Sequence, residues 1–305
     1  MFYRIRAGIL MPCTKQEMYN RQDSYIAVNH MQEPLELIEG NAACALVESA
    51  FENQAIRFES REGVDLICFG KVAFPHHKLH LDRVYMLFGP GWLQVVCQED
   101  GWVKSLIDSF AKEKNIFWTL GKVIVRLFES QGNRDVEYLE YLEGCISELE
   151  DKIITGKEKT DYVKSIIHFR KHLMRLRQIY EQTFDLLEDF SENENGLLDG
   201  TALKYVKIYA NKIDRLYDRV GRLQEYVTEI RDAYQAQVDI SLNRVMKFFT
   251  VITSIFLPLT LIAGWYGMNL RMPEYGWEWG YPVVITVSVL LVIVEIIYFK
   301  KNKWF

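Results

Sequence analysis

The chain has 305 residues, of which 49% are hydrophobic, and its formal net charge is −5 at pH 7. This length suits one folded domain of about 200 residues together with a membrane part. The acidic balance argues against a nucleic-acid partner. The five cysteines are scattered and contain no CxxC pair, so neither a disulfide framework nor a zinc knuckle is indicated.

Residues 1–130 predict a cytoplasmic mixed α/β domain. Short apolar runs such as Val84–Phe88 and Leu93–Cys97 have the length of strands and are bounded by glycine. The Gly-Pro-Gly turn at 89–91 predicts that these two runs form a hairpin. A helix is expected over Val103–Phe110.

Residues 131–200 are expected to form charged cytoplasmic helices, and residues 201–247 a stalk helix. Apolar residues in the stalk alternate spacings of three and four, which is typical of a coiled-coil seam. The alternative is a helix that packs on its own domain. No proline or turn cluster interrupts this segment before residue 248, so the helix is expected to continue directly into a membrane span. The seam consists of Val206, Tyr209, Ile213, Leu216, Val220, Leu223, Val227, Ile230 and Tyr234.

Residues 248–305 predict a membrane domain with spans at about 248–266 and 281–299. The first span carries no charged residue and the second carries only Glu295. About 20 apolar residues suffice to cross the hydrocarbon core, and aromatic residues cluster at both ends, as they do at membrane interfaces. The alternative, a buried hairpin of two core helices, is disfavoured because core helices rarely run so long without charge.

The distribution of basic residues predicts the orientation of these spans. Three lysines follow the second span and two basic residues precede the first, whereas the connecting loop holds one arginine against two glutamates. The positive-inside rule therefore predicts that both termini lie in the cytoplasm and that the loop lies outside. The protein is expected to be a multi-pass protein of the cell (inner) membrane. Glu295 lies about one turn before Lys300, so its side chain is expected to reach the inner interface.

Polar and small residues recur on one face of the first span, which predicts the lining of a pore. Two spans per chain cannot enclose a water-filled path, so a channel requires several copies. The alternative for the threonines is a hydrogen bond back to their own helix. Met246 and Leu257 could form apolar constrictions that gate by dewetting. The predicted lining consists of Asn243, Met246, Phe249, Thr250, Thr253, Leu257, Thr260 and Gly264, with Asp232 and Asp239 at the cytoplasmic mouth.

The loop between the spans carries Gly267, Met268 and Asn269. A ring of Asn269 amide oxygens from several copies could hold a hydrated magnesium ion, because magnesium gives up its water reluctantly. Glu274 could raise the local concentration of cations. The chain contains no G-x-x-x-x-G-K-[ST] motif and no visible catalytic set, so neither an ATP-driven pump nor an enzyme is indicated.

The sequence from Asn243 to Pro282, with its ending YFKKNKWF, resembles the CorA magnesium transporters. Gly267, Met268 and Asn269 occupy the Gly-Met-Asn signature of that family, which is part of a superfamily of divalent cation channels. The resemblance is specific over about residues 201–305 and rests only on the order of elements before that. Its outer-loop motif, Met-Pro-Glu, is occupied by Met272, Pro273 and Glu274.

The resemblance implies a homopentameric funnel in which an α+β cytoplasmic domain precedes a stalk helix continuous with the first of two transmembrane helices. It also implies that Asn269 forms the outer selectivity ring, as the metal-binding residue, and that intracellular magnesium closes the pore at acidic sites that the sequence does not locate. The partners implied are membrane lipid, further copies of the chain and divalent cations.

The leading hypothesis is passive, potential-driven transport of hydrated magnesium, with cobalt or nickel as further ions. Its nearest alternative is a transporter of zinc or another divalent cation from the same superfamily. A membrane-anchored scaffold, whose long helix serves assembly only, is the alternative from another class. The absence of soft ligands along the pore face favours magnesium over zinc.

Overall fold

The computed structural model divides the chain into two units, Met1–Glu229 and Ile230–Phe305. The residues described are 1–18, 23–30, 33, 46, 55–61, 63–73, 80–97, 101–155, 162–268, 276–302 and 304, with the backbone alone at 71, 73, 80 and 131–134.

The first unit is built on a seven-stranded sheet with the order β2-β1-β3-β7-β6-β5-β4. Neighbouring strands are antiparallel except β3 and β7, which are parallel. The predicted hairpin is confirmed, because β6 and β7 pair in a register that places Gly89 opposite Trp92. A Cβ atom on Gly89 would lie 2.4 Å from the indole of Trp92, so any larger residue at this position would displace the Trp92 side chain. The strands are β1 (Phe2–Arg6), β2 (Ile9–Cys13), β3 (Ser24–His30), β4 (Arg57–Arg61), β5 (Val64–Ala73), β6 (His80–Gly89) and β7 (Trp92–Cys97).

Helices follow the sheet in the chain. The expected helix at Val103–Phe110 is present as α2, and α5 runs without a break through the predicted stalk and first span. α3 begins earlier than the sequence suggested, so the boundary expected at residue 130 falls inside it. The helices are α2 (Trp102–Lys112), α3 (Leu120–Thr155), α4 (Tyr162–Glu192), α5 (Gly200–Tyr266) and α6 (Gly280–Lys301).

The early start of α3 has a packing reason. Its first turns are apolar and lie in the core, whereas the charged pattern that marked the helix in the sequence begins only near Asp135. Phe128 is 1% exposed, and its ring lies 4.9 Å from Phe69 of β5 and 5.9 Å from Tyr209 of α5. The sheet and α5 therefore hold the apolar first part of α3 in place, and the charged pattern marks only the later part of this helix.

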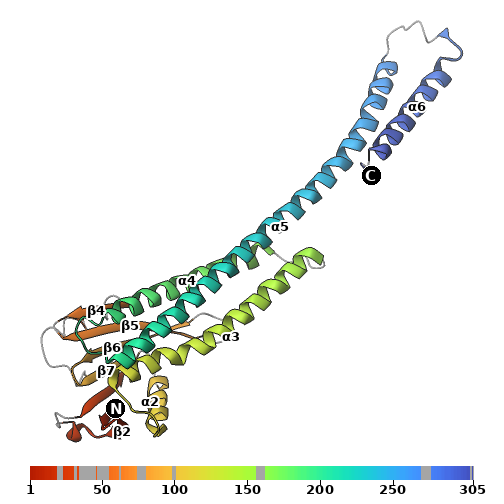
Figure 1. The fold of residues 1–305 in the computed structure, drawn as a ribbon. Helices are drawn as coiled ribbons and strands as arrows, with labels where there is room; N and C mark the ends of the chain where they lie inside the picture. The colour runs from red at the N-terminus through yellow and green to blue at the C-terminus, as the bar shows by residue number, and fades with distance from the viewer. Residues whose placement is uncertain are drawn as a thin grey trace. The chain divides into compact units, whose positions relative to one another are not determined.

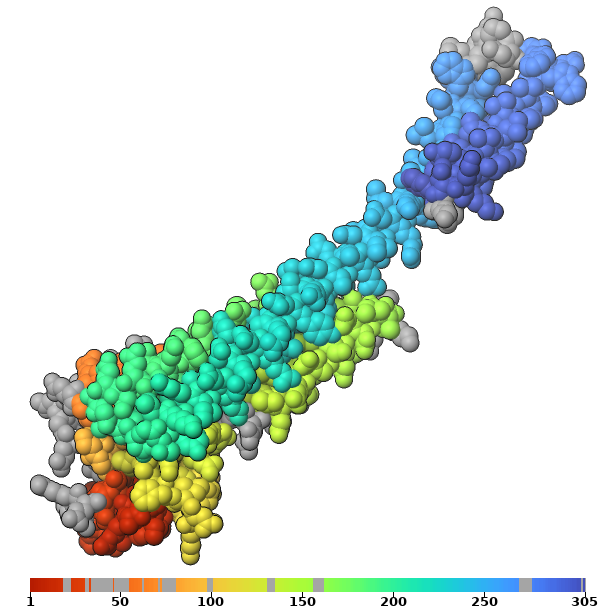
Figure 2. All heavy atoms as spheres, viewed as in Figure 1, coloured from red at the N-terminus to blue at the C-terminus, as the bar shows by residue number. Residues whose placement is uncertain are grey.

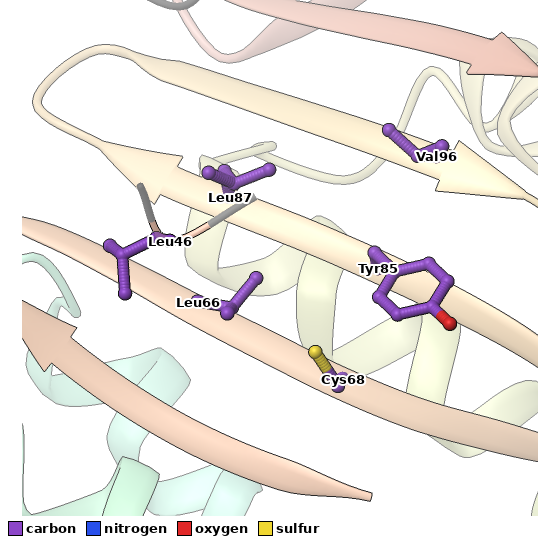
Figure 3. Packing of buried hydrophobic residues seen from close by; sticks show 6 residues of the cluster. All are labelled: Leu46, Leu66, Cys68, Tyr85, Leu87 and Val96. Carbon is purple, nitrogen blue, oxygen red and sulfur yellow. The ribbon is translucent and has the colours of Figure 1, made fainter. Parts of the chain in front are cut away.

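The sheet has buried residues on both faces, and alternate residues of each strand point to opposite faces. One face carries a cluster of buried residues from three neighbouring strands and from Leu46 (Figure 3). On the opposite face, Phe69 of β5 meets α3. In Figure 2 the green atoms of α4 and the first part of α5 hide most of the orange atoms of the strands. The cluster consists of Leu46, Leu66, Cys68, Tyr85, Leu87 and Val96.

The predicted seam of α5 is buried from Val206 to Ile230, and Tyr234 is half buried, but the partners of the seam are helices of the same chain (Figure 1). Arg219 of α5 donates to Glu143 of α3 at 2.9 Å, and Arg177 of α4 donates to Tyr217 of α5 at 2.9 Å. The alternative of a helix that packs on its own domain is therefore correct for this stretch. A coiled coil between copies is not needed to explain the spacing of three and four.

The second unit consists of the last part of α5 and of α6, which run antiparallel and side by side (Figure 1). Both helices are long and apolar enough to cross a membrane, and only 6% of the most apolar stretch of each is buried. The α+β domain, the continuous stalk helix and the two C-terminal apolar helices confirm the predicted fold class.

Candidate ion-conduction site

Within the second unit, one face of α5 packs against α6. Val251 of α5 and Phe299 of α6 are 3% and 6% exposed, and they are the most buried side chains of the two apolar stretches. The half-buried residues share the same faces at helical spacing. On α5 they are Ser254, Ile255, Pro258, Leu259 and Ile262, and on α6 they are Val284, Ser288, Leu291, Val292 and Glu295.

The predicted pore-lining residues lie on the other side of α5. At about 100° per residue, the eight predicted lining residues and the two aspartates fall within a sector of about 120°. The residues that face α6 occupy the remaining directions. Every predicted lining residue from Asn243 to Gly264 is exposed in the single chain. The structure therefore gathers them on one face of α5 that α6 does not cover.

Part of this face forms an open groove of about 770 Å³ along α5. Four predicted lining residues, Thr253, Leu257, Thr260 and Gly264, contribute to it. The remainder of the groove is apolar and aromatic. A surface of this kind can meet lipid or another copy of the chain, and its polar edge can meet water. The other residues that line the groove are Ile252, Phe256, Leu261, Trp265 and Met268.

The threonine hydroxyls of this face are bonded to their own helix. Thr250 donates to the carbonyl oxygen of Met246 at 2.8 Å, and Thr260 donates to that of Phe256 at 2.8 Å. Thr253 makes the same bond to Phe249 at 2.9 Å. The alternative prediction for the threonines, a hydrogen bond back to their own helix, is therefore correct for the hydroxyl protons. Each oxygen keeps lone pairs, so the face presents acceptors and can hydrogen-bond the waters around a cation.

The end of α5 explains the glycine of the loop motif. The backbone N–H of Gly267 donates to the carbonyl oxygen of Ala263 at 2.8 Å, and that of Met268 donates to Trp265 at 3.3 Å. A Cβ atom on Gly267 would lie 2.8 Å from the same Ala263 oxygen. Any other residue would push this last turn apart. Asn269, Met272, Pro273 and Glu274 lie outside the described residues.

The two aspartates predicted at the cytoplasmic mouth are exposed on α5. Asp232 accepts two hydrogen bonds from its neighbour Arg231, at 3.0 and 2.8 Å. Such an exposed pair has little net effect on stability. Asp239 stays on the same face as Asn243 and the threonines. The two aspartates therefore extend this face of α5, which we call the polar face, from the predicted lining residues toward the N-terminus of the helix.

Glu295 was expected to reach the membrane interface. In the structure its side chain is half buried on the α6 face that packs against α5, and its Oε2 atom is buried without a hydrogen-bond partner among the described residues. Its spacing from Val284, Ser288 and Phe299 explains this position. The sequence showed its closeness to Lys300 but not the face of α6 that the packing selects.

Known proteins are similar to this chain in sequence and in fold. The family description "CorA-like Mg2+ transporter protein" matches residues 46–301. The cobalt/magnesium transport protein CorA of Thermotoga maritima is 33% identical over 167 residues, which cover 54% of this chain and 47% of that protein. The magnesium transport protein CorA of Wolinella succinogenes is 29% identical over 188 residues, 60% of this chain and 57% of that protein. The chain thus spans about half the length of the curated relatives it matches.

A solved structure supports the same assignment at the level of the fold. The CorA magnesium transporter from Methanocaldococcus jannaschii matches with a TM-score of 0.80 over 100% of this chain and 99% of that chain, at 17% identity. The matched residues 46–301 include the strands β4 to β7 and the helices α2 to α6. The chain therefore belongs to the CorA-like Mg2+ transporter family.

Proposed function

We propose that this chain conducts hydrated Mg²⁺ passively across a membrane, through a pore lined by α5 from several copies. The observation that carries the proposal is the polar face of α5, which is turned away from α6 and is exposed in the single chain. One hairpin of helices cannot enclose water, so this face needs further copies around it. We propose five copies, as the resemblance to the family implies.

The chemistry of the face suits an ion that keeps its water. Mg²⁺ dehydrates reluctantly and binds through water where it can. The threonine oxygens can accept hydrogen bonds from that water, because their own protons are already bonded to the helix. Contacts through water are weak enough to release the ion. Met246, Phe249 and Leu257 from several copies would form three apolar constrictions along the path. We assign these constrictions as sites where the path can lose its water and close.

The outer end of the path is assigned to the Gly267-Met268-Asn269 loop. A ring of Asn269 amide oxygens would select the hydrated ion, and Met272, Pro273 and Glu274 would shape the entrance and concentrate cations there. Asp232 and Asp239 would attract the ion at the cytoplasmic mouth. A membrane potential of about 100 mV, negative inside, gives two charges roughly 4.6 kcal/mol, so entry needs no other energy source.

We place both termini in the cytoplasm of a cell, with residues 248–305 as the membrane domain and residues 201–247 as the stalk. Lys300 and Lys301 in the last turn of α6 support this orientation. We propose that cytoplasmic Mg²⁺ also regulates the pore. Among the described residues no group of three His, Cys, Asp or Glu side chains is placed to hold a metal, so we assign no residues to that regulation.

Cobalt remains a further candidate ion, since the Thermotoga maritima relative is named a cobalt/magnesium transport protein. Zinc is less well supported, because the polar face of α5 offers oxygen atoms and no thiolate or imidazole. Transport, rather than catalysis, accounts for the residues gathered on α5.

Uptake into proteoliposomes tests the function directly. The full chain is reconstituted with a Mg²⁺-sensitive dye inside, and uptake is compared for the native chain, Asn269→Ala and the exposed control Asn302→Ala. We expect uptake that follows the imposed potential, a fall of about tenfold or more in Asn269→Ala, equal to at least ~1.4 kcal/mol, and no change in Asn302→Ala. Unchanged uptake in Asn269→Ala would contradict the assignment of Asn269 to the selectivity ring. No uptake by any of the three proteins would support the alternative of a membrane-anchored scaffold.

Thiol accessibility tests the lining separately from the flux. Thr253→Cys and Thr260→Cys should react with a water-soluble thiol reagent, as should Asn243→Cys. Thr286→Cys is the matched control, because Thr286 makes the same hydroxyl-to-carbonyl bond on α6, to Pro282 at 2.8 Å. Reaction at Thr286→Cys without reaction at Thr253→Cys and Thr260→Cys would overturn the assignment of the α5 face.

A further inference from the structure

Asp135 of α3 is a buried carboxylate that the transport path does not use. Its side chain is 2% exposed, and its Oδ1 atom has no hydrogen-bond partner among the described residues. A buried charge without a partner is strongly unfavourable, so a protein usually pairs it or neutralises it. Asp135 therefore calls for an explanation within the first unit.

The groups around Asp135 come from all three long helices. Tyr180 of α4 is 1% exposed, and its hydroxyl is also buried without a hydrogen-bond partner among the described residues. The charge of Asp135 raises the pKa of Tyr180, after the larger effect of burial, and does the same to Tyr209 of α5. The titratable groups whose charges act on Asp135, on Tyr180 or on Tyr209 are Glu129 and Tyr138 from α3, Asp135 itself, and Tyr209 and Lys212 from α5.

Burial raises the pKa of Asp135 from 3.8 to about 7, and the positive charge of Lys212 opposes this rise. A carboxyl in a hydrophobic surrounding behaves in this way because burial penalises its ionised form. The acid and the carboxylate are then both populated near neutral pH. Ordinary aspartates on the surface are ionised throughout that range.

We propose that Asp135 is a proton-responsive group that sets how α5 packs against α3 and α4. When Asp135 is protonated, no unpaired charge is buried among α3, α4 and α5. When Asp135 is ionised, its buried charge is unfavourable, and the attraction to Lys212 offsets only part of that cost. Loss of the proton thus loosens the packing of α5 on α3 and α4.

This site can influence transport because α5 is one helix from Gly200 to Tyr266. Lys212 and the polar face that begins at Asn243 belong to the same element, with no break between them. A change in the packing of α5 at Lys212 therefore acts on the helix that carries the polar face. This consequence rests on the proposed transport function, whereas the proton-responsive site does not.

Infrared titration of the full chain in detergent tests the site itself. The carboxylic-acid signal is measured against pH for the native chain and for Asp135→Asn, with Asp151→Asn as an exposed control on the same helix. We expect the native chain and Asp151→Asn to share a signal that is lost near pH 7 and that Asp135→Asn lacks. Lys212→Met should move the loss to higher pH. A signal lost near the ordinary aspartate value, or one that survives in Asp135→Asn, would overturn the proposal.

Mg²⁺ uptake against internal pH tests the consequence. Between about pH 6 and about pH 8 the ionised fraction of Asp135 rises from about one tenth to about nine tenths. The native rate should therefore change by about twofold or more, while Asp135→Asn keeps the rate that the native chain shows at low pH. The same pH dependence in both would overturn the coupling. Absence of uptake at every pH would instead count against the proposed function, and the infrared titration would still decide the site.

Discussion

The two units of this chain follow opposite rules of burial. In Met1–Glu229 most large apolar side chains are buried, as on both faces of the sheet, and most charged side chains lie at the surface. Beyond Ile230, only Val251 and Phe299 are buried among the described hydrophobic residues, and the other apolar side chains point outward. Water favours the first arrangement and hydrocarbon permits the second. The helix α5 belongs to both units: its apolar seam is buried up to Ile230, and most of its later apolar side chains are exposed.

The contrast predicts that equal truncations have unequal costs in the two units. Phe128→Ala removes a ring that is 1% exposed and packs on Phe69 and Tyr209, so we expect a loss of about 3–5 kcal/mol in the free energy of unfolding. Phe256→Ala removes a ring that is 62% exposed and should cost less than about 1 kcal/mol in detergent. Denaturant unfolding followed by far-UV circular dichroism checks both. Equal losses in the free energy of unfolding would show that Phe256 is packed in solution, which would contradict the difference in burial between the two units.

A second prediction concerns the buried acid of the first unit. The pKa of Asp135 is raised from 3.8 to about 7 in the folded protein, so the folded state binds this proton more tightly than the unfolded state does. Its contribution is fully favourable below about pH 4 and is lost as the pH rises toward 7. Asp135→Asn should therefore stabilise the chain at pH 8 by about 2–4 kcal/mol relative to the change at pH 4. Thermal unfolding at the two pH values measures this, and a pH-independent effect would contradict it.

A third prediction concerns a polar contact between the sheet and the turn before α5. Asn195 donates to Asp65 at 2.7 Å and to Ser60 at 2.8 Å, and it accepts from the backbone of Gly63 at 3.1 Å. Asp65 is 1% exposed, so Asn195→Ala leaves a buried carboxylate short of a donor and should cost about 1–3 kcal/mol.

Hydrogen exchange of the β4–β5 hairpin reports this loss locally. Asn211→Ala, an exposed change on α5, serves as its control and should leave the exchange of the hairpin unchanged. Equal exchange in both variants would mean that Asn195 does not hold the hairpin.

The smallest effect is expected at the loop between the spans. Gly267→Ala places a Cβ atom 2.8 Å from the Ala263 oxygen, whereas Gly276→Ala meets nothing within 4 Å. We expect a distortion of about 1 kcal/mol and a severalfold fall in Mg²⁺ uptake for Gly267→Ala alone. Uptake in proteoliposomes checks it. A similar fall in Gly276→Ala would show that the loop as a whole, rather than the end of α5, is sensitive.

Much of the fold could be predicted from the sequence because its signals are local. Long apolar runs with at most one charge predicted both spans. The absence of a proline or turn cluster before residue 248 predicted that α5 continues into the first span, and a Gly-Pro-Gly turn predicted the β6–β7 hairpin. The pore-lining residues could be proposed from spacing alone. Their role still awaits the accessibility and uptake measurements, and Asn269 lies outside the described residues.

The sequence by itself determined which segments are helices, strands and spans, and which residues share one face of α5. Only the tertiary structure decided what each face meets: the seam of α5 packs on α3 and α4 of its own chain, and the polar face is the one that α6 leaves uncovered. The packing buries Asp135 and half-buries Glu295, and the sequence predicted neither. The reason is physical, because periodicity is a property of neighbouring residues, whereas burial depends on partners distant in the chain.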